Sequence, residues 1–252
     1  MTVPWLEHAF TTRLGGVSDG AFASLNLSFL VGDQPQRVRE NRRLLAGALR
    51  YDPERLVCGR QAHGANVVVV TPRIAGSGAF DAQTALGETD GLITNSAGIP
   101  LMAFFADCVP VVLADTENKA AGIVHAGWRG TVRQVPVKAL GRMSGAFGTR
   151  AARCLAAIGP AIGPCCFNVS EPVAAEFSRW GDKVVHKDAD GYRVDLWEAN
   201  RRILIDAGVL AENISVVNIC TACRPELMFS HRRDAGRTGR MSAVVSIRPE
   251  GY

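Results

Sequence analysis

The segment LMAFFADCVPVVLADTENKAAGIVHA, residues 101–126, contains three short apolar runs. They cover residues 101–105, 109–114 and 120–125, and many of their positions are aliphatic or β-branched. Runs of this length and composition predict β-strands, and the absence of polar alternation predicts that both faces of these strands are covered. The segment therefore predicts a sheet in the interior of the protein.

Strands and helices are mixed along the rest of the chain. Five further β-branched runs predict strands at residues 66–71, 91–94, 155–158, 214–219 and 242–247. Apolar side chains at helical spacing predict helices at residues 34–50, 131–143, 171–180 and 196–207. Residues 72–88 have no periodicity and predict a mobile surface loop that is a candidate lid. Because we find no repeat and no linker, we expect a single α+β domain over residues 1–252.

The composition excludes several classes of protein. Of 252 residues, 47% are apolar and 21% charged, with a net charge of +4, so the chain can form a core and is not disordered. So small a positive surplus gives no reason to expect nucleic acid or a membrane as partner. The apolar runs are also far shorter than the ~20 residues of a membrane-spanning helix. The start, MTVPWLEHAF, has no secretory signal and the seven cysteines are an odd number, so we expect reduced thiols and a cytoplasmic location.

Three residues that can bind a metal lie beside predicted strands. His63 precedes one strand, Cys108 stands between two apolar runs, and His125 ends another. Two imidazoles and a thiolate are a credible ligand set for Zn²⁺, with a fourth position left for water or substrate. The spacing matches no compact metal motif, so ordinary core and capping roles stay open. Cys108 and His125 also fit a thiol nucleophile and its base, with Asp107 or another carboxylate orienting the imidazole.

Arginines and the other cysteines are weaker signals. Arg13 adjoins a Gly-Gly turn, Arg129 precedes a predicted helix, and residues 230–240 contain four arginines. A guanidinium near a helix N-terminus suits phosphate, although arginine-rich turns are often only solvated surface. The pair Cys165-Cys166 and the single motif Cys220-x-x-Cys223 are poor evidence for zinc, and we expect buried, inert thiols there. Cys58 and Cys154 are expected in the core.

Several motifs in the same order resemble those of the polyphenol oxidase (laccase-domain) family. Its members are described as multifunctional purine nucleoside phosphorylases and adenosine deaminases, and some are named peptidoglycan editing factor. The likeness runs from about Phe10 to Arg240. It rests on the segments TTRLGGVSDG (11–20), QAHG (61–64), ETDGLIT (88–94), FADCVPVVLAD (105–115), HAGWRG (125–130), IGPAIGPCCFNVS (158–170), DLWEANRRIL (195–204) and FSHRRDAGRTGR (229–240).

This resemblance implies a fold and a metal site. The fold would be a layered α/β/β/α domain similar to cysteine-hydrolase-like toxins. The metal ligands would be His63, Cys108 and His125. The chain departs from the family pattern at Ala62, at Ser230-His231 and in a longer turn at residues 234–238, which are positions that bear on substrate preference and on the role of the arginine cluster.

The leading hypothesis is a zinc-dependent purine nucleoside phosphorylase with adenosine deaminase activity. Its substrates would be adenosine, inosine, guanosine and methylthioadenosine, and we expect a monomer or weak dimer. Arg13, Arg129 and Arg233 are the candidates to hold phosphate, and Asp90 or Asp107 would donate a proton or hydrogen bond to the leaving purine. For deamination, the metal would activate water that attacks the purine C6.

Three other hypotheses remain open. The first is copper-dependent oxidation of phenols, although five histidines in the whole chain are too few for a multicopper cluster. The second is a metal-free cysteine hydrolase that uses Cys108 and His125 on an amide, for example of a peptidoglycan precursor. The third is a non-catalytic binding module that zinc stabilises.

Overall fold

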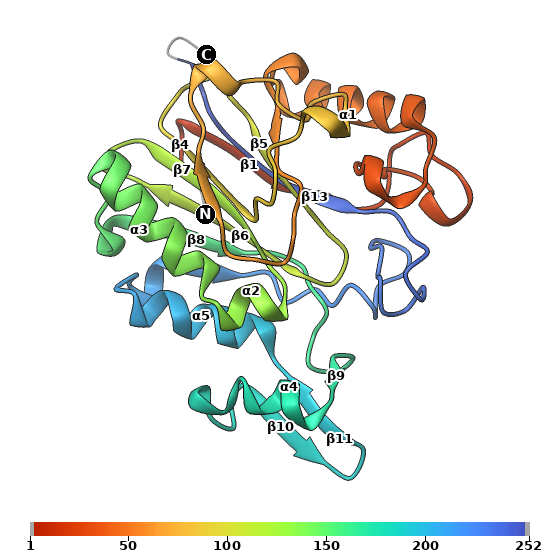
Figure 1. Ribbon diagram of the computed structural model, residues 1–252, viewed down its shortest axis with the longest axis vertical. Helices are drawn as coiled ribbons and strands as arrows, with labels where there is room; N and C mark the ends of the chain where they lie inside the picture. The colour runs from red at the N-terminus through yellow and green to blue at the C-terminus, as the bar shows by residue number, and fades with distance from the viewer. Residues whose placement is uncertain (1–2, 250–252) are drawn as a thin grey trace.

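The computed structural model describes residues 3–249 as two stacked β-sheets with helices on both outer faces (Figure 1). The larger sheet has the strand order β12 (Ile214–Val216), β8 (Cys154–Ile158), β6 (Val109–Asp115), β7 (Ala120–Ala126), β4 (Gly91–Thr94) and β3 (Val67–Val69). The smaller sheet has the order β1 (Leu6–Phe10), β13 (Met241–Ile247), β5 (Leu101–Phe105) and β2 (Val57–Cys58).

Residues 101–126 supply strands to both sheets. β6 and β7 form an antiparallel pair at the centre of the larger sheet, and every residue of both strands is buried. β5 belongs to the smaller sheet, where it pairs with β13 and β2. Side chains from both sheets, including Leu101, Val112 and Ile123, form the apolar layer between them. This burial on both faces explains why the strands are apolar throughout.

Helices cover the two outer faces. α1 (Pro35–Leu49) packs through Leu45 on the smaller sheet. α2 (Trp128–Val132), α3 (Val135–Phe147) and α5 (Leu196–Asp206) lie on the other side of the molecule and cover the larger sheet (Figure 1). The order helix, sheet, sheet, helix is the layering that the family resemblance implies. The likeness to cysteine-hydrolase-like toxins stays a prediction.

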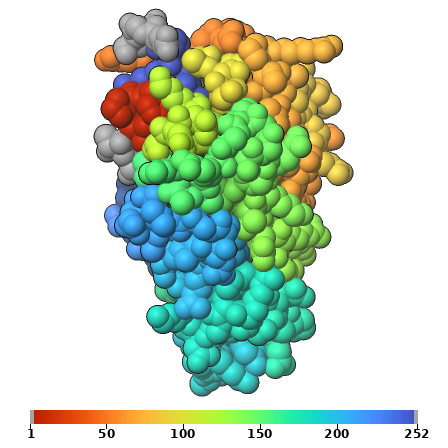
Figure 2. Space-filling view, turned by 90° about the vertical axis from the view of Figure 1, so that its left-hand side faces the viewer, coloured from red at the N-terminus to blue at the C-terminus, as the bar shows by residue number. Residues whose placement is uncertain are grey.

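A small third sheet lies at one end of the molecule. Its strands are β10 (Val185–Asp188), β11 (Gly191–Val194) and β9 (Asn168–Val169), and α4 (Glu171–Ala175) packs beside them. Figure 2 shows this part of the chain as the lower end of an elongated surface. Together with β1 and β2, these three strands were not predicted, because they are short and several carry exposed polar residues instead of an apolar pattern.

Two predicted helices differ from the observed ones. The segment 131–143 belongs to two helices, because Gln134 adopts a left-handed conformation with φ of 56° and Pro136 stands in the first turn of α3. The segment 171–180 forms α4 only as far as Ala175, and a 3₁₀ turn follows at Ser178–Trp180. Among residues 3–249, every helix is too short or too polar to span a bilayer.

Residues 72–88 form an irregular surface segment, as expected, and their mobility stays a prediction. The buried guanidinium of Arg42 donates hydrogen bonds of 2.6 Å to the carbonyl oxygens of both Gly78 and Ala79. Two 3₁₀ turns, Pro72–Ile74 and Ala82–Thr84, give the segment local structure. The N–H of Cys58 in β2 also donates to the carbonyl oxygen of Ser77, so residues 77–79 are held beside the smaller sheet.

Candidate metal-binding active site

His63, Cys108 and His125 converge at one end of the larger sheet. Their potential ligand atoms all lie within 4.8 Å of one another, and the two imidazole rings meet edge to face at a centroid distance of 4.9 Å. The strand register accounts for part of this arrangement. β6 and β7 pair Pro110 with His125, and Cys108 directly precedes β6. The structure therefore brings together the three predicted metal ligands, which we call the His-Cys-His site.

Asp90 positions both histidines of this site. Its Oδ1 lies 2.9 Å from Nδ1 of His125 and accepts a hydrogen bond of 3.0 Å from the backbone N–H of His63. Its Oδ2 accepts a hydrogen bond of 2.7 Å from the N–H of Gly64. These bonds hold the loop in which His63 has a positive φ of 57°, and they leave Nε2 of His125 available to a metal. A carboxylate behind a ligating histidine is a common outer partner of metal sites.

Opposite charges favour a thiolate at Cys108. Burial alone would raise the pKa of this thiol, but the charge of His125 and hydrogen bonds from His125 and His63 lower it to about 6. Burial alone would also lower the pKa of His125, but Cys108 and Asp90 together raise it to about 9. The protein without metal thus favours a thiolate–imidazolium pair, and the thiolate is the form of cysteine that binds metals.

Gly127 keeps space free beside the ligands. A Cβ atom at this position would lie 2.8 Å from Sγ of Cys108 and 3.2 Å from Cδ2 of His63, which is too close for ordinary packing. The donor set of two nitrogens and one sulfur suits zinc, and three protein ligands leave one coordination position open. The residues present therefore fit a metal ion.

The His-Cys-His site opens into a cavity of about 360 Å³, within the ~300–1,000 Å³ range of small-molecule sites. The walls combine aromatic and basic side chains. Arg232 and Arg240 contribute positive charge, and Nη1 of Arg240 donates to the carbonyl oxygens of Thr238 and Gly239. Further lining residues are Ser28, Leu30, Val31, Gln61, Phe104, Phe105, Asp107, Ile162, Phe167 and His231. Residues 72–88, the candidate lid, do not line this cavity.

Asp107, the second predicted carboxylate, is a buried residue of the cavity wall. Its Oδ1 accepts a hydrogen bond of 2.6 Å from Oγ1 of Thr221, and its Oδ2 accepts one of 2.6 Å from the backbone N–H of Arg232. Asp107 therefore connects the turn of Cys108 to the C-terminal segment that carries Arg232.

The three arginines predicted to hold phosphate do not line the cavity. The guanidinium of Arg13 lies over the ring of Phe229 and donates to carbonyl oxygens of Ala23 and Pro225. That of Arg129 is exposed and lies over the ring of Trp128. Arg233 pairs with Asp234 and donates to two carbonyl oxygens.

Sequence reasoning identified the arginine-rich segment 230–240 but not the side chains that face the cavity. The structure directs Arg232 and Arg240 to the cavity, while Arg233 points to neighbouring backbone. No periodic pattern distinguishes these arginines, because residues 230–240 form turns and coil. The aromatic residue Phe167 was likewise unmarked, apart from its place in a motif of the family.

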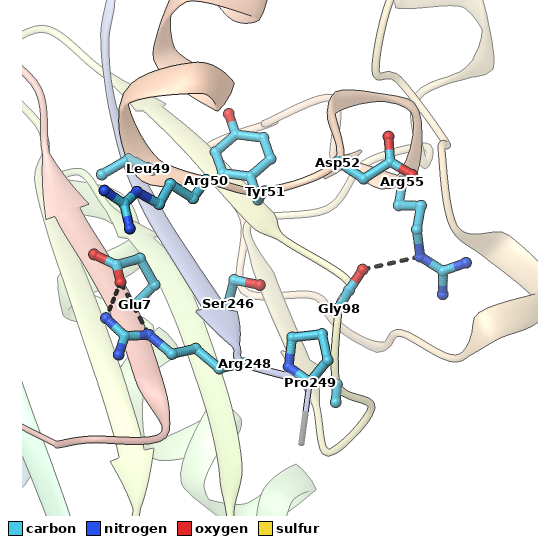
Figure 3. A pocket seen from close by; sticks show the side chains of 11 residues that line it. Glu7, Leu49, Arg50, Tyr51, Asp52, Arg55, Gly98, Ser246, Arg248 and Pro249 are labelled. Carbon is cyan, nitrogen blue, oxygen red and sulfur yellow. Dashed lines mark hydrogen bonds and ion pairs between the residues drawn. The ribbon is translucent and has the colours of Figure 1, made fainter. Parts of the chain in front are cut away.

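A larger cavity of about 440 Å³ lies elsewhere, between the end of α1 and the ends of β1 and β13 (Figure 3). Glu7 and Arg248 pair across it, and Nε of Arg55 donates to the carbonyl oxygen of Gly98. Its described lining contains neither histidine nor cysteine. It therefore has no group comparable to the His-Cys-His site.

The remaining cysteines divide into two kinds. Cys58 and Cys154 are buried, as predicted. Of the four thiols expected to be buried and inert, Cys220 is buried, Cys166 is half-buried, and Cys165 and Cys223 are exposed, so the expected burial is wrong for the last two. The four sulfur atoms lie within 4.8 Å of one another. The two pairs are 54 or more residues apart in the chain, so only the folded structure reveals that they meet.

Comparison with known proteins identifies the family. The chain is 42% identical over 253 residues to purine nucleoside phosphorylase YlmD of Geobacillus stearothermophilus, covering 95% of this chain and 89% of that protein. It is 38% identical over 239 residues to adenosine deaminase RL5 of an unknown prokaryotic organism, covering 92% and 90% of the two chains. The crystal structure of YlmD from G. stearothermophilus superposes with a TM-score of 0.94 at 40% identity, covering 98% and 93%.

A family model confirms the resemblance drawn from the motifs. Residues 7–248 match the model described as multi-copper polyphenol oxidoreductase laccase. The match covers almost all of the part of the chain that the structure describes. The chain therefore belongs to the multi-copper polyphenol oxidoreductase laccase family.

Proposed function

We propose that this protein is a metal-dependent purine nucleoside phosphorylase that also deaminates adenosine. The observation that carries the proposal is the His-Cys-His site at the base of a cavity that also presents Arg232 and Arg240. The names of the relatives, one a purine nucleoside phosphorylase and another an adenosine deaminase, support the same reactions. The proposed substrates are adenosine, inosine, guanosine and methylthioadenosine.

His63, Cys108 and His125 would hold the metal, for which we propose zinc. Bound there, zinc supplies Lewis-acid polarisation and water activation at the open coordination position. Asp90 keeps the ring of His125 in one orientation and fixes the loop of His63, so the ligands are held before a metal arrives. A copper oxidase needs several histidines, and among residues 3–249 this site gathers only two.

Arg232 and Arg240 are the proposed phosphate ligands. Both side chains line the cavity, and guanidinium groups form strong, charge-assisted hydrogen bonds to phosphate. Phosphate oxygen would attack the anomeric carbon of the ribose while the glycosidic C–N bond breaks. The purine leaves with the bonding electron pair and takes up a proton. Because positive charge develops on the sugar, a phosphate held close to it stabilises the transition state.

The aromatic side chains and Asp107 would position the purine. Phe104 and Phe167 offer apolar faces within the cavity, which suit a flat heterocycle. Of the two candidate carboxylates, Asp107 lines the cavity and Asp90 does not. We therefore assign the hydrogen bond to the leaving purine to Asp107. In deamination, water adds to the purine C6 and ammonia leaves.

The test is incubation of the purified, metal-loaded protein with adenosine, with and without phosphate. We expect adenine and ribose 1-phosphate only with phosphate, and inosine in both cases. Chromatography separates adenine and inosine, and an enzymatic assay detects the sugar phosphate. Cys154→Ala is the matched control for Cys108→Ala, because Cys154 is a buried cysteine outside both groups of ligands. Products no more abundant than with Cys108→Ala would contradict the proposal.

One observation favours a second candidate, the metal-free cysteine hydrolase. Cys108, His125 and Asp90 follow one another in contact, as thiol, base and orienting carboxylate do in cysteine hydrolases. This candidate predicts hydrolysis of an amide, for example of a peptidoglycan precursor, that resists chelation but is abolished when Cys108 is alkylated. Loss of activity on chelation, with recovery on adding zinc, would exclude it.

A further inference from the structure

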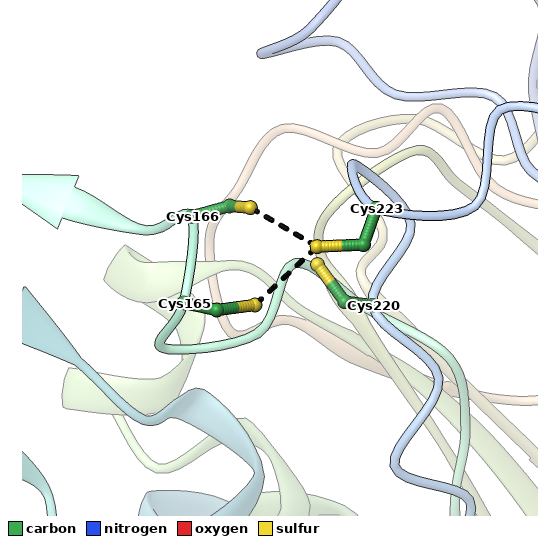
Figure 4. A group of neighbouring side chains, drawn as sticks. All are labelled: Cys165, Cys166, Cys220 and Cys223. Atoms are coloured by element: carbon green, nitrogen blue, oxygen red, sulfur yellow. Dashed lines mark hydrogen bonds between the residues drawn. The ribbon is translucent and has the colours of Figure 1, made fainter.

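Two pairs of cysteines from different loops meet at the surface of the protein. Cys165 and Cys166 lie between β8 and β9, while Cys220 and Cys223 lie between β12 and β13. Sγ of Cys223 is 3.6 Å from Sγ of Cys165 and 3.4 Å from Sγ of Cys166. Figure 4 shows the four thiols directed toward a common point. We call this group the four-cysteine cluster.

The spacing of the sulfur atoms fits ligands around one metal ion. A tetrahedral zinc site with Zn–S bonds of ~2.3 Å places neighbouring sulfurs roughly 3.8 Å apart. The observed 3.4 and 3.6 Å are close to that value and far longer than the ~2.05 Å of a disulfide bond. The motif Cys220-x-x-Cys223 has a spacing common in structural zinc sites. The vicinal pair completes the four ligands.

The surroundings of the cluster also suit a metal thiolate. The backbone N–H of Gly163 donates to Sγ of Cys220 at 3.3 Å, a contact that orients a sulfur ligand. Four thiolates around one divalent cation carry a net charge of −2. The cationic side chain of Arg232 approaches the same segment, since its Nη1 is 3.5 Å from the carbonyl oxygen of Cys166.

We propose that Cys165, Cys166, Cys220 and Cys223 bind one zinc ion in a closed, four-thiolate structural site. Four protein ligands leave no coordination position for substrate, so the site has no catalytic role. It joins two loops that already exchange backbone hydrogen bonds: Ala161 donates to Ile219 at 3.2 Å, and Thr221 donates to Ala161 at 2.9 Å. This proposal does not depend on the proposed function.

The two joined loops support the wall of the catalytic cavity. Phe167, which lines the cavity, directly follows Cys166, and Thr221, which directly follows Cys220, donates to Asp107. Nη1 of Arg232 donates to the carbonyl oxygen of Asn168 at 2.9 Å. Zinc in the cluster would thus hold Phe167, Asp107 and Arg232 in place without touching substrate.

The experiment measures metal in protein that lacks the His-Cys-His site. Cys108→Ala protein is purified with reductant and zinc, freed of loose metal, and analysed by mass spectrometry for metals. We expect about one zinc per chain, and none after Cys223→Ser is added. Cys154→Ser in the same background is the control and should retain the zinc. Cobalt in place of zinc should give thiolate-to-cobalt charge-transfer absorption with the intensity of four thiolates, and zinc removal should lower the Tm by about 5–10 °C.

A second measurement covers the case in which Cys223→Ser does not fold. Cys108→Ala protein is titrated with a mercurial reagent that modifies thiols, and the released zinc is measured with an indicator dye. The zinc should be released in proportion to the modification of four thiols. Absence of retained zinc would overturn the proposal. So would recovery of the cluster as disulfides, seen as a loss of two mass units per pair, or a bound iron–sulfur cluster instead of zinc.

Discussion

The His-Cys-His site and the four-cysteine cluster both gather metal-binding side chains, but they differ in ligand number and support. The first has three ligands, is supported by β4, β6 and β7, and opens into a cavity. The second has four thiols on two loops, with Cys165 and Cys223 exposed. A missing fourth ligand leaves a place for substrate, whereas a complete set closes the site. In our proposals, the number of protein ligands, rather than the presence of cysteine, distinguishes the reactive site from the structural one.

Loss of a ligand from the open site should have the largest effect. We expect Cys108→Ala to lower turnover of adenosine by at least about 10³-fold, since the site loses its thiolate and its metal. When both proteins are compared without metal, the Tm should change little, because Cys108 is a small residue at the edge of a cavity. Steady-state kinetics and a thermal melt measure both. Equal losses of activity for Cys108→Ala and Cys223→Ser would remove the distinction between the two sites.

Filling the space beside the ligands should have the next largest effect. Gly127→Ala places a methyl group 2.8 Å from Sγ of Cys108, so we expect about a 100-fold loss of activity and weaker metal binding. Gly141→Ala in α3 is the matched control. A Cβ there meets nothing within 4 Å, and the change should stabilise the protein by about 0.5–1 kcal/mol. Wild-type activity in Gly127→Ala would show that the ligands do not need this space.

Asp90→Asn tests whether the carboxylate of Asp90 positions the two histidine ligands. We expect a 10- to 100-fold loss of metal affinity or activity, the usual effect of altering such a partner. Asp90 raises the pKa of His125, and His125 in turn lowers the pKa of Cys108 to about 6. In metal-free protein the variant should therefore have less imidazolium, and the Cys108 pKa should rise. Alkylation of Cys108, followed by peptide mass spectrometry, should be half-maximal near pH 6 in the wild type and at higher pH in the variant. An unchanged pH profile would show that Asp90 does not influence the thiolate–imidazolium pair of Cys108 and His125.

The smallest expected effect concerns phosphate. Arg232→Ala should raise the KM for phosphate about tenfold, because the variant loses one partly exposed, charge-assisted hydrogen bond to phosphate. The KM for adenosine should change less. Arg129→Ala is the control, because Arg129 is exposed and lies outside the cavity lining. A larger effect at Arg129 than at Arg232 would return the phosphate site to the position predicted from the sequence.

Much of the fold followed from local patterns. The strands at 91–94 and 101–105 coincide with β4 and β5, and the helix at 34–50 differs from α1 by one residue at each end. These elements are predictable because burial on a face imposes an apolar period on the sequence. The strands β9 to β11 lie at the surface and have no such period, which explains why they were missed.

The amino-acid sequence alone identified His63, Cys108 and His125 as candidate metal ligands, because each stands in a motif beside an apolar strand. Imidazole and thiolate groups can bind a metal in any fold, so their chemistry is evident from the residue type. The sequence could not choose among the arginines of residues 230–240 or reveal that two distant cysteine pairs meet. Those outcomes depend on which way side chains point from irregular loops, where no repeating backbone geometry relates position to direction. Only packing between segments that are far apart in the sequence brings such loops into contact.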